Sequence, residues 1–143
     1  MIKLVDIDAS NFRSVLKLEV DETQKKDVSS PSITMSRAYV YRETAKALAI
    51  YKDSILIGYT LIRSYDDTYC IDQFAIDKEY QNRGYGKSSF KMILDGLRDE
   101  RRFEKVTLCH YDNSILSRFY ENFGFRFSDM DEDEIILVLD LEK

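Results

Sequence analysis

The strongest constraint in this sequence is a glycine-bearing loop at residues 81–86, which separates an apolar segment from an amphipathic one. Residues 69–76, before the loop, are rich in aromatic and β-branched side chains, which is typical of a buried strand. Residues 87–98, after it, carry apolar side chains at i, i+3, i+4 and i+7, which predicts a helix with one buried face. A strand, a tight loop and a helix in this order indicate an α/β fold.

The same loop predicts an anion-binding site. Backbone N–H groups in the first turn of a helix have no partner inside the helix, and the helix dipole places about half a positive charge there. Gly84 and Gly86 let a phosphate approach the main chain without a Cβ in the way, and Arg83 and Lys87 can add charge. The ligand is therefore expected to carry phosphate.

Two common phosphate-binding loops each fail at one residue. A Walker loop ends in Gly-Lys-Ser, as residues 86–88 do here, but it requires its first glycine where Gln81 stands. A dinucleotide fingerprint that starts at Gly84 requires its last glycine where Ser89 stands, and the chain has no room for a nucleotide half-domain followed by a catalytic domain. The pattern that remains is Gln81-Asn82-Arg83-Gly84-Tyr85-Gly86.

The rest of the chain predicts a single domain, residues 1–143, with a mixed sheet. With 143 residues and 44% hydrophobic side chains, the chain is long enough for one buried core and too short for two ordinary domains. We expect further strands at residues 2–5, 47–51, 55–62, 106–109, 125–127 and 135–141.

Helices are expected in three further places, and residues 22–35 are expected to form a loop or a broken helix. The first follows a cap at Ser10, a second spans about residues 37–45, and the last runs from Asn113 or Ser114 to Gly124. The side chains expected on their apolar faces are Phe12, Val15 and Leu16 in the first helix, and Ile115, Phe119, Tyr120 and Phe123 in the last.

Charge limits the possible partners. The formal net charge is -5 and the pI is near 5.0, so polyanionic nucleic acids and membrane surfaces would be repelled, whereas a cationic substrate is favoured. The N-terminus has no basic region followed by a long apolar stretch, and the longest apolar run, residues 135–139, is too short to span a bilayer. We expect a soluble, cytoplasmic protein that binds neither nucleic acid nor membrane.

Metal and thiol chemistry have little support in the sequence. Cys70 and Cys109 lie in strand-like segments without a CxxC pattern, and His110 is the single histidine, so no zinc site can be assembled. In a reducing cytoplasm both cysteines are expected to be buried free thiols. Because neighbours on a strand point to opposite faces, Cys109 and His110 are not expected to form a nucleophilic pair.

Together with its surroundings, the glycine loop resembles the pyrophosphate loop of the GNAT superfamily of N-acetyltransferases, Gln/Arg-x-x-Gly-x-Gly/Ala. The resemblance extends upstream over residues 71–77 and downstream to Asn113 and residues 117–125. The last run is similar to the signature Ala-x-x-x-Tyr-x-x-x-Gly-Phe, with Tyr120 in the tyrosine position and Ser117 in the alanine position. The close match covers about half of the chain.

This resemblance implies the acyl-CoA N-acyltransferase fold: a mostly antiparallel central sheet of six to seven strands, splayed in the middle and flanked by about four helices. It also implies acetyl-CoA as the acyl donor and no metal. The pantetheine arm would enter the gap between the splayed strands and hydrogen-bond to exposed main chain, as an added strand would. The implied cofactor-binding residues are Phe74, Ala75, Ile76, Gln81, Asn82, Arg83, Gly84, Tyr85, Gly86, Lys87, Asn113 and Tyr120.

The resemblance further implies direct attack of an amine on the thioester, without an acyl-enzyme. Tyr120 would protonate the departing thiolate, although the helix pattern alone makes it a core aromatic. A free alkylamine has a pKa of roughly 10, so presenting it neutral at pH 7 costs about 4 kcal/mol unless a base or a desolvating pocket helps. The candidate bases are Asp72 first and Glu22 second; Asp72 could instead position the substrate or pair with a cation.

The acceptor is expected to be a small, cationic amine. Weak likeness to bacterial spermine/spermidine acetyltransferases, at Gln24 and residues 71–74, suggests a polyamine such as spermidine or spermine, which the acidic segment 129–134 could attract. Against this, Gln73 and Cys70 replace an arginine and a tryptophan of those enzymes. Aminoglycosides, protein N-termini or lysines, and a non-catalytic acyl-CoA sensor are the alternatives. The superfamily resemblance also allows a homodimer.

Overall fold

The computed structural model of the chain describes residues 1–111 and 114–141. Within this part, a seven-stranded sheet carries four α-helices and two short 3₁₀ helices. The strands are β1 (Ile2–Asp6), β2 (Ala45–Lys52), β3 (Ile55–Tyr65), β4 (Thr68–Ile76), β5 (Lys105–Tyr111), β6 (Arg126–Asp131) and β7 (Glu134–Asp140). The helices are α1 (Phe12–Leu16), η1 (Glu22–Gln24), α2 (Pro31–Val40), η2 (Lys78–Tyr80), α3 (Tyr85–Glu100) and α4 (Ser114–Glu121).

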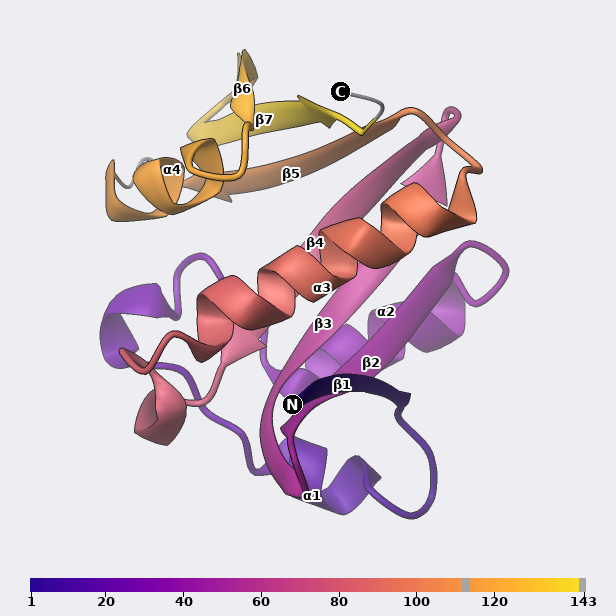
Figure 1. Ribbon diagram of the computed structural model, residues 1–143, viewed down its shortest axis with the longest axis vertical. Helices are drawn as coiled ribbons and strands as arrows, with labels where there is room; N and C mark the ends of the chain where they lie inside the picture. Colours follow the sequence, from indigo (N-terminus) through magenta and orange to yellow (C-terminus); the bar gives the residue numbers. More distant parts are fainter. Residues whose placement is uncertain (112–113, 142–143) are drawn as a thin grey trace.

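The sheet is mixed, as the sequence predicts (Figure 1). Its strand order is β1-β2-β3-β4-β5-β7-β6, and each neighbouring pair is antiparallel except β4 and β5, which run parallel. Helix α3 connects these two parallel strands, which a two-residue hairpin could not do. The predicted fold class, a mostly antiparallel sheet of six to seven strands with about four helices, is confirmed.

The strands β4 and β5 separate in the middle of the sheet. Among the described residues, the pairing between them consists of Tyr69 with Val106 and Cys70 with Thr107, although β4 continues to Ile76. Figure 1 shows the two strands diverging beyond this short contact. The predicted splay is therefore present, and it leaves one edge of β4 unpaired in its second half.

A bulge in β4 lies where the strands part. Leu61 pairs with Gln73, but the next residue of β3, Ile62, pairs with Ile71, so Asp72 is the extra residue of β4. A bulge bends its strand and increases the local twist, and bulges are frequent beside active sites. The bend accounts for the departure of β4 from β5.

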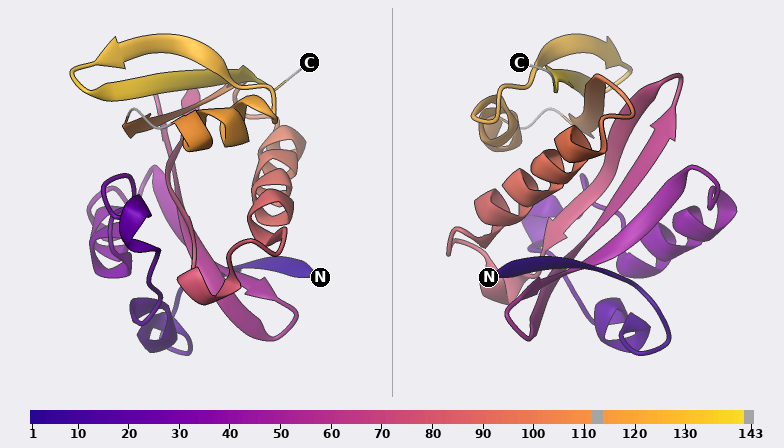
Figure 2. Two further views of the ribbon diagram at one scale, coloured as in Figure 1. Left: turned by 90° about the vertical axis from the view of Figure 1, so that its left-hand side faces the viewer. Right: turned by 45° about the vertical axis from the view of Figure 1, so that its right-hand side comes forward.

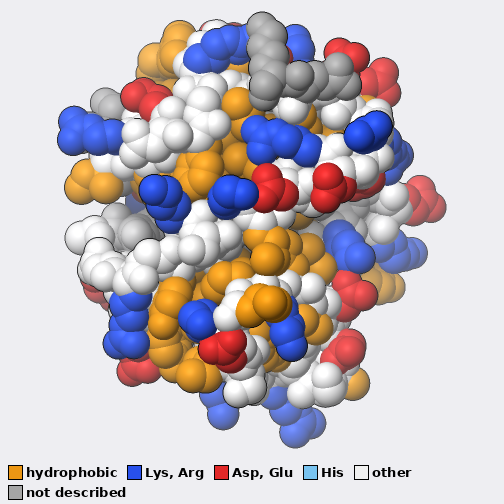
Figure 3. All heavy atoms as spheres, in the orientation of Figure 1, with side chains coloured by type: hydrophobic (Ala, Val, Ile, Leu, Met, Phe, Trp, Pro, Cys, Tyr) orange, Lys and Arg blue, Asp and Glu red, His pale blue; other side chains and the backbone are white. Residues whose placement is uncertain are grey.

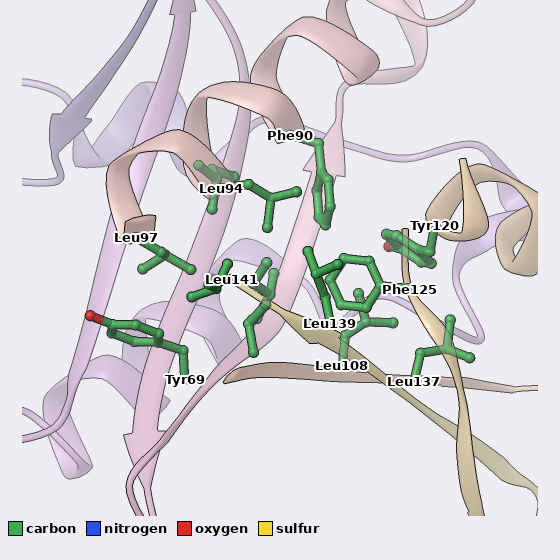
Figure 4. Packing of buried hydrophobic residues seen from close by; sticks show 13 residues of the cluster. Tyr69, Phe90, Leu94, Leu97, Leu108, Tyr120, Phe125, Leu137, Leu139 and Leu141 are labelled. Atoms are coloured by element: carbon green, nitrogen blue, oxygen red, sulfur yellow. The ribbon is translucent and has the colours of Figure 1, made fainter. Parts of the chain in front are cut away.

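The main core lies between the sheet and helices α3 and α4. The predicted apolar stripe of α3 is buried, namely Phe90, Ile93, Leu94 and Leu97. The ring of Phe90 is fully buried and lies 5.8 Å from Phe119 and 4.9 Å from Phe123, centroid to centroid. Figure 4 shows Phe90 beside Tyr120 and Phe125. This aromatic cluster fixes α4 against α3.

Helices α1 and α2 cover the opposite face of the sheet (Figure 2). Val15 of α1 packs with Ala49 of β2 and Tyr59 of β3 in a second, smaller core cluster. The central strands are therefore covered on both faces, and the segment between α1 and α2 crosses the side of the molecule where β4 and β5 part.

The first helix differs from its prediction in detail. Its N-cap residue is Asn11 rather than Ser10, whose hydroxyl group donates to the Asp8 carboxylate instead. Of the predicted apolar face, Val15 is fully buried, whereas Leu16 is 43% exposed. Serine and asparagine are both good caps, so composition could not separate the two positions.

The predicted helix at residues 37–45 is placed too late in the sequence. Helix α2 begins at Pro31 and ends at Val40, so its first half lies in the segment predicted as a loop or a broken helix. The Ser30 hydroxyl oxygen accepts the Ile33 N–H at 3.3 Å, and the proline occupies the first turn, where its missing N–H costs nothing. Ser30 and Pro31 together therefore form the start signal of this helix, which begins six residues before the predicted start.

Two side chains and one segment differ from their predictions. Cys70 is buried as expected, but the expected burial of Cys109 is wrong, because its side chain is exposed. Ile115 is 80% exposed and not part of the core. The acidic segment 129–134 is the hairpin of β6 and β7 rather than a separate loop. Helix α4 ends at Glu121, and Gly124, with φ of 101°, closes the turn that follows it.

Positive and negative side chains are mixed on the surface that carries α3. In Figure 3, Lys and Arg side chains are interspersed with Asp and Glu over the face that carries α3. None of the helices in the described part of the chain is long and apolar enough to cross a membrane.

Candidate active site

The glycine loop enters helix α3 through a left-handed residue. Gly84 is the N-cap of the helix with φ of 83°, a conformation that side chains with a Cβ rarely adopt. The first intrahelical hydrogen bond here runs from the Ser88 N–H to the Gly84 carbonyl at 3.2 Å. The N–H groups of Tyr85, Gly86 and Lys87 therefore precede the hydrogen-bonded part of the helix and can face an anion.

The side chain of Gln81 braces this loop. Its Nε2 donates to the Ile76 carbonyl at the end of β4 and to Gln24 Oε1 in η1, both at 2.8 Å. Asn82 and Arg83 are exposed, and the Arg83 guanidinium lies 5.7 Å from the centroid of the Tyr80 ring. The loop thus offers backbone groups and one exposed cation, Arg83, and the inward-facing Gln81 side chain holds its backbone in place.

A cavity of about 280 Å³ leads from this loop into the gap between β4 and β5. One wall is the second half of β4 with the loop, and the other is β5 with α4. Of the predicted cofactor-binding residues, it is lined by Phe74, Ala75, Ile76, Gln81, Asn82, Gly86 and Tyr120. A slot with a free strand edge along one side and helix N–H groups at one end fits an acyl-CoA arm and its diphosphate.

Tyr120 lies at the inner end of this slot. Its side chain is only 9% exposed, and its ring centroid lies 5.3 Å from Phe90 and 6.0 Å from His110. Burial, and to a smaller extent the Asp27 carboxylate, raise the pKa of the Tyr120 hydroxyl above its usual range. The hydroxyl therefore keeps its proton at neutral pH, as a proton donor must.

A second cavity of about 1060 Å³ adjoins the first on the side of α1 and α2. Its lining is mixed in charge rather than acidic. The cations are Lys17, Lys25, Lys26, Arg37 and Arg63, and the anions are Glu19, Asp27, Asp72 and Glu134. Tyrosine rings from α2's C-terminal end and from β3 also line it, at Tyr41, Tyr59 and Tyr65.

The two candidate bases are in different places. Asp72, the bulge residue, lines both cavities, and its Oδ2 lies 3.7 Å from Arg63 Nη1 and 4.0 Å from Arg37 Nη1. Glu22 lies on η1 with its side chain 85% exposed, pairs with Lys25 at 2.7 Å, and lines neither of the two cavities. The structure brings Asp72 to the site and leaves Glu22 outside it.

Contacts between distant segments build the second cavity, and local sequence patterns do not predict which segments meet. The Ser29 N–H donates to Gln73 Oε1 at 2.8 Å, and the Tyr59 hydroxyl donates to the Ser29 carbonyl at 2.8 Å. Asp27 Oδ1 accepts the Tyr111 N–H at 2.8 Å, across the gap between the early segment and β5. Buried Gln73 in an apolar strand was the one available signal, because a buried amide needs partners.

Cys109 and His110 point to opposite faces of β5, as predicted, because the thiol is exposed and the imidazole is 3% exposed. Asn113, predicted to contact the cofactor arm, lies outside the described residues. Within the described residues, no group of three or more His, Cys, Asp or Glu side chains could hold a metal ion.

Comparison with known proteins identifies the family. The model of the acetyltransferase (GNAT) family matches residues 12–125. A curated relative, the probable spermine N(1)-acetyltransferase of Bacillus subtilis subsp. natto, is 27% identical over an alignment of 139 residues that covers 89% of this chain and 89% of the relative.

Solved structures share the fold. The spermidine N-acetyltransferase of Vibrio cholerae, in complex with CoA and spermine, superposes with a TM-score of 0.81 at 15% identity, covering 99% of this chain and 96% of that one. The ribosomal-protein-S18-alanine N-acetyltransferase of Escherichia coli gives 0.75 at 14% identity, covering 99% and 94%.

The chain belongs to the acetyltransferase (GNAT) family. It is an acetyl-CoA-dependent N-acetyltransferase, as the glycine loop and the tyrosine signature predicted.

Proposed function

We propose that the protein transfers the acetyl group of acetyl-CoA to a primary amine of a small molecule, with a polyamine such as spermidine or spermine as the leading acceptor. The observation that supports this best is the junction of the two cavities. A slot suited to an acyl-CoA arm ends at buried Tyr120 and shares lining residues, among them Asp72, with a larger cavity on the other side of β4 and β5. Donor and acceptor would meet at that junction.

The predicted cofactor-binding residues and Tyr120 each have a role in this proposal. The N–H groups of residues 84–87 hold the diphosphate, with Arg83 and Lys87 adding charge, and the β4 main chain at Phe74, Ala75 and Ile76 binds the pantetheine arm. The Tyr120 hydroxyl donates its proton to the departing thiolate. Asn113, which lies outside the described residues, keeps the contact with the arm that the sequence predicts.

The polyamine assignment draws on the relatives and on the cavity. A spermine acetyltransferase at 27% identity favours a multiply charged amine, and four carboxylates line the larger cavity. We assign Asp72 to the placement of a substrate ammonium group, because it projects from the β4 bulge and is one of two carboxylates, with Asp27, that line both cavities. The five cations in the same lining oppose a polycation, so the acceptor has to be tested directly.

The decisive experiment is a panel assay. The purified protein is incubated with acetyl-CoA and with spermine, spermidine, aminoglycosides, amino acids and peptides that have free N-termini, and thiol release is followed. We expect release with polyamines above all others. Release with peptides or aminoglycosides alone would contradict the polyamine assignment, and no release with any amine, despite acetyl-CoA binding by calorimetry, would favour a sensor.

A further inference from the structure

A group that removes a proton from the acceptor must reach the junction where the amine meets the thioester. Eight residues line both cavities, and four of them can titrate: Asp27, Asp72, Cys109 and His110. The proton acceptor is therefore sought among these four side chains.

Cys109 and His110 are poorly suited to the task. Although its side chain is exposed, partial desolvation raises the pKa of the Cys109 thiol to about 11, so the thiol keeps its proton at neutral pH. His110 has both ring nitrogens engaged: Nδ1 donates to the Tyr111 carbonyl, and Nε2 lies 3.1 Å from Ser117 Oγ. Because a carbonyl only accepts, Nδ1 carries a proton, and Nε2 is engaged by the serine hydroxyl.

The two carboxylates differ in their surroundings. Asp72 lies between two guanidinium groups, those of Arg63 and Arg37, which balance its charge. No Lys or Arg in the described part of the chain lies within 4.0 Å of the Asp27 carboxylate. One of its oxygens, Oδ1, accepts the Tyr111 N–H, which fixes the carboxylate against the end of β5.

Asp27 also lies near the proton donor. Both residues line the smaller cavity, and after burial the Asp27 carboxylate is the second cause that raises the pKa of Tyr120. Residue 27 comes from the segment between η1 and α2, and Tyr120 comes from α4, so the two groups reach the junction from different walls.

We infer that Asp27 is the proton acceptor of the reaction, an assignment that rests on the acetyltransferase function proposed above. Its carboxylate takes one proton from the substrate ammonium, and the freed nitrogen forms a bond to the thioester carbonyl carbon. The C–S bond breaks with its electron pair on sulfur, which takes the Tyr120 proton. The phenolate then takes the extra proton of the new amide nitrogen, and Asp27 releases its proton to solvent, so each turnover releases one proton.

The test is Asp27→Asn, which keeps an oxygen for the Tyr111 N–H and removes the base. With the panel amine that the native protein acetylates fastest, we expect kcat/KM at pH 7 to fall about 100-fold or more. The loss should shrink as the pH rises toward the pKa of the amine, because the amine then loses its proton to water. With an alkoxyamine, which is largely neutral at pH 7, the variant should stay within about 3-fold of the native protein.

Two comparisons make the result specific. Asp72→Asn should raise KM for the acceptor more than it lowers kcat and should leave the pH profile in place. Asp27→Glu, which retains a carboxylate, should be at least about 10-fold faster than Asp27→Asn. Acetyl-CoA affinity, measured by calorimetry, should be unchanged in all three variants.

The assignment is overturned if Asp27→Asn keeps native kcat/KM at pH 7, or if it slows the alkoxyamine as much as the protonated amine. It is also overturned if the pH-dependent loss appears in Asp72→Asn instead. If the native protein binds acetyl-CoA but acetylates no amine, the proposed function fails first, and that result is distinct from a slow variant of an active enzyme.

Discussion

The donor side and the acceptor side of the cleft are built in different ways. On the donor side, the groups that face the ligand belong to the main chain: the start of α3 beyond Gly84 and the unpaired edge of β4. On the acceptor side they are side chains from the segment between α1 and α2, from α2, and from β3 to β5. A site made of main-chain groups requires only a few glycines and the right strand order in the sheet. A site made of side chains requires a particular residue at each of its positions.

This difference predicts that the two sides respond separately to mutation. A change in the loop should alter acetyl-CoA binding for every acceptor, and a change around Ser29 or Asp72 should alter acceptor binding and leave acetyl-CoA affinity as it is. Tyr120 and Asp27 lie where the sides meet and should alter turnover without altering either affinity.

The largest effect is expected for Tyr120→Phe. Loss of the proton donor should lower kcat by about 10² to 10⁴-fold, with acetyl-CoA affinity kept, because the ring still fills its place beside Phe90. Since burial raises the pKa of Tyr120, the native enzyme should not lose activity below about pH 10 through ionisation of this group. Tyr39→Phe, at a tyrosine that is 69% exposed, is the control and should change nothing in the same kinetic assay.

The next effect is expected for Gly84→Asp. The new Cβ would occupy a backbone with φ of 83°, and the carboxylate would repel the diphosphate, so the Kd for acetyl-CoA should rise about 100-fold in calorimetry. Gly96→Ala, in the same helix and with open space around the new Cβ, is the matched control. An unchanged Kd in Gly84→Asp would show that the loop does not hold the cofactor.

A smaller effect is expected for Gln73→Ala, which leaves the Ser29 N–H without its 2.8 Å partner. The free energy of unfolding should fall by about 1–3 kcal/mol, and KM for the acceptor should rise about 10-fold with acetyl-CoA affinity retained. Tyr59→Phe removes the other bond to Ser29 and should act in the same direction. Chemical denaturation measures the first effect, steady-state kinetics the second, and calorimetry the acetyl-CoA affinity. If Gln73→Ala weakened acetyl-CoA binding as much as it raised KM for the acceptor, the separation of the two sides would be contradicted.

The same difference explains what the sequence could predict. The glycine spacing at Gly84 and Gly86 and the stripe around Phe90 are local patterns, so the strand, loop and helix were predicted correctly. Asp72 was identified as a candidate from its position in the strand. The bulge at Asp72 was not predicted, because a bulge is a shift in the pairing of β4 with β3, and the sequence of β4 alone does not determine that pairing. Nothing near Asp27 in the sequence indicates that it meets Tyr111, 84 residues away.

The most direct test of this account is a ¹H–¹⁵N NMR titration with coenzyme A. The account predicts that the largest amide shifts occur at Tyr85, Gly86 and Lys87, whose N–H groups precede the first hydrogen bond of α3. If those amides did not move while coenzyme A bound elsewhere on the protein, the assignment of the loop, and the mechanism that depends on it, would be contradicted.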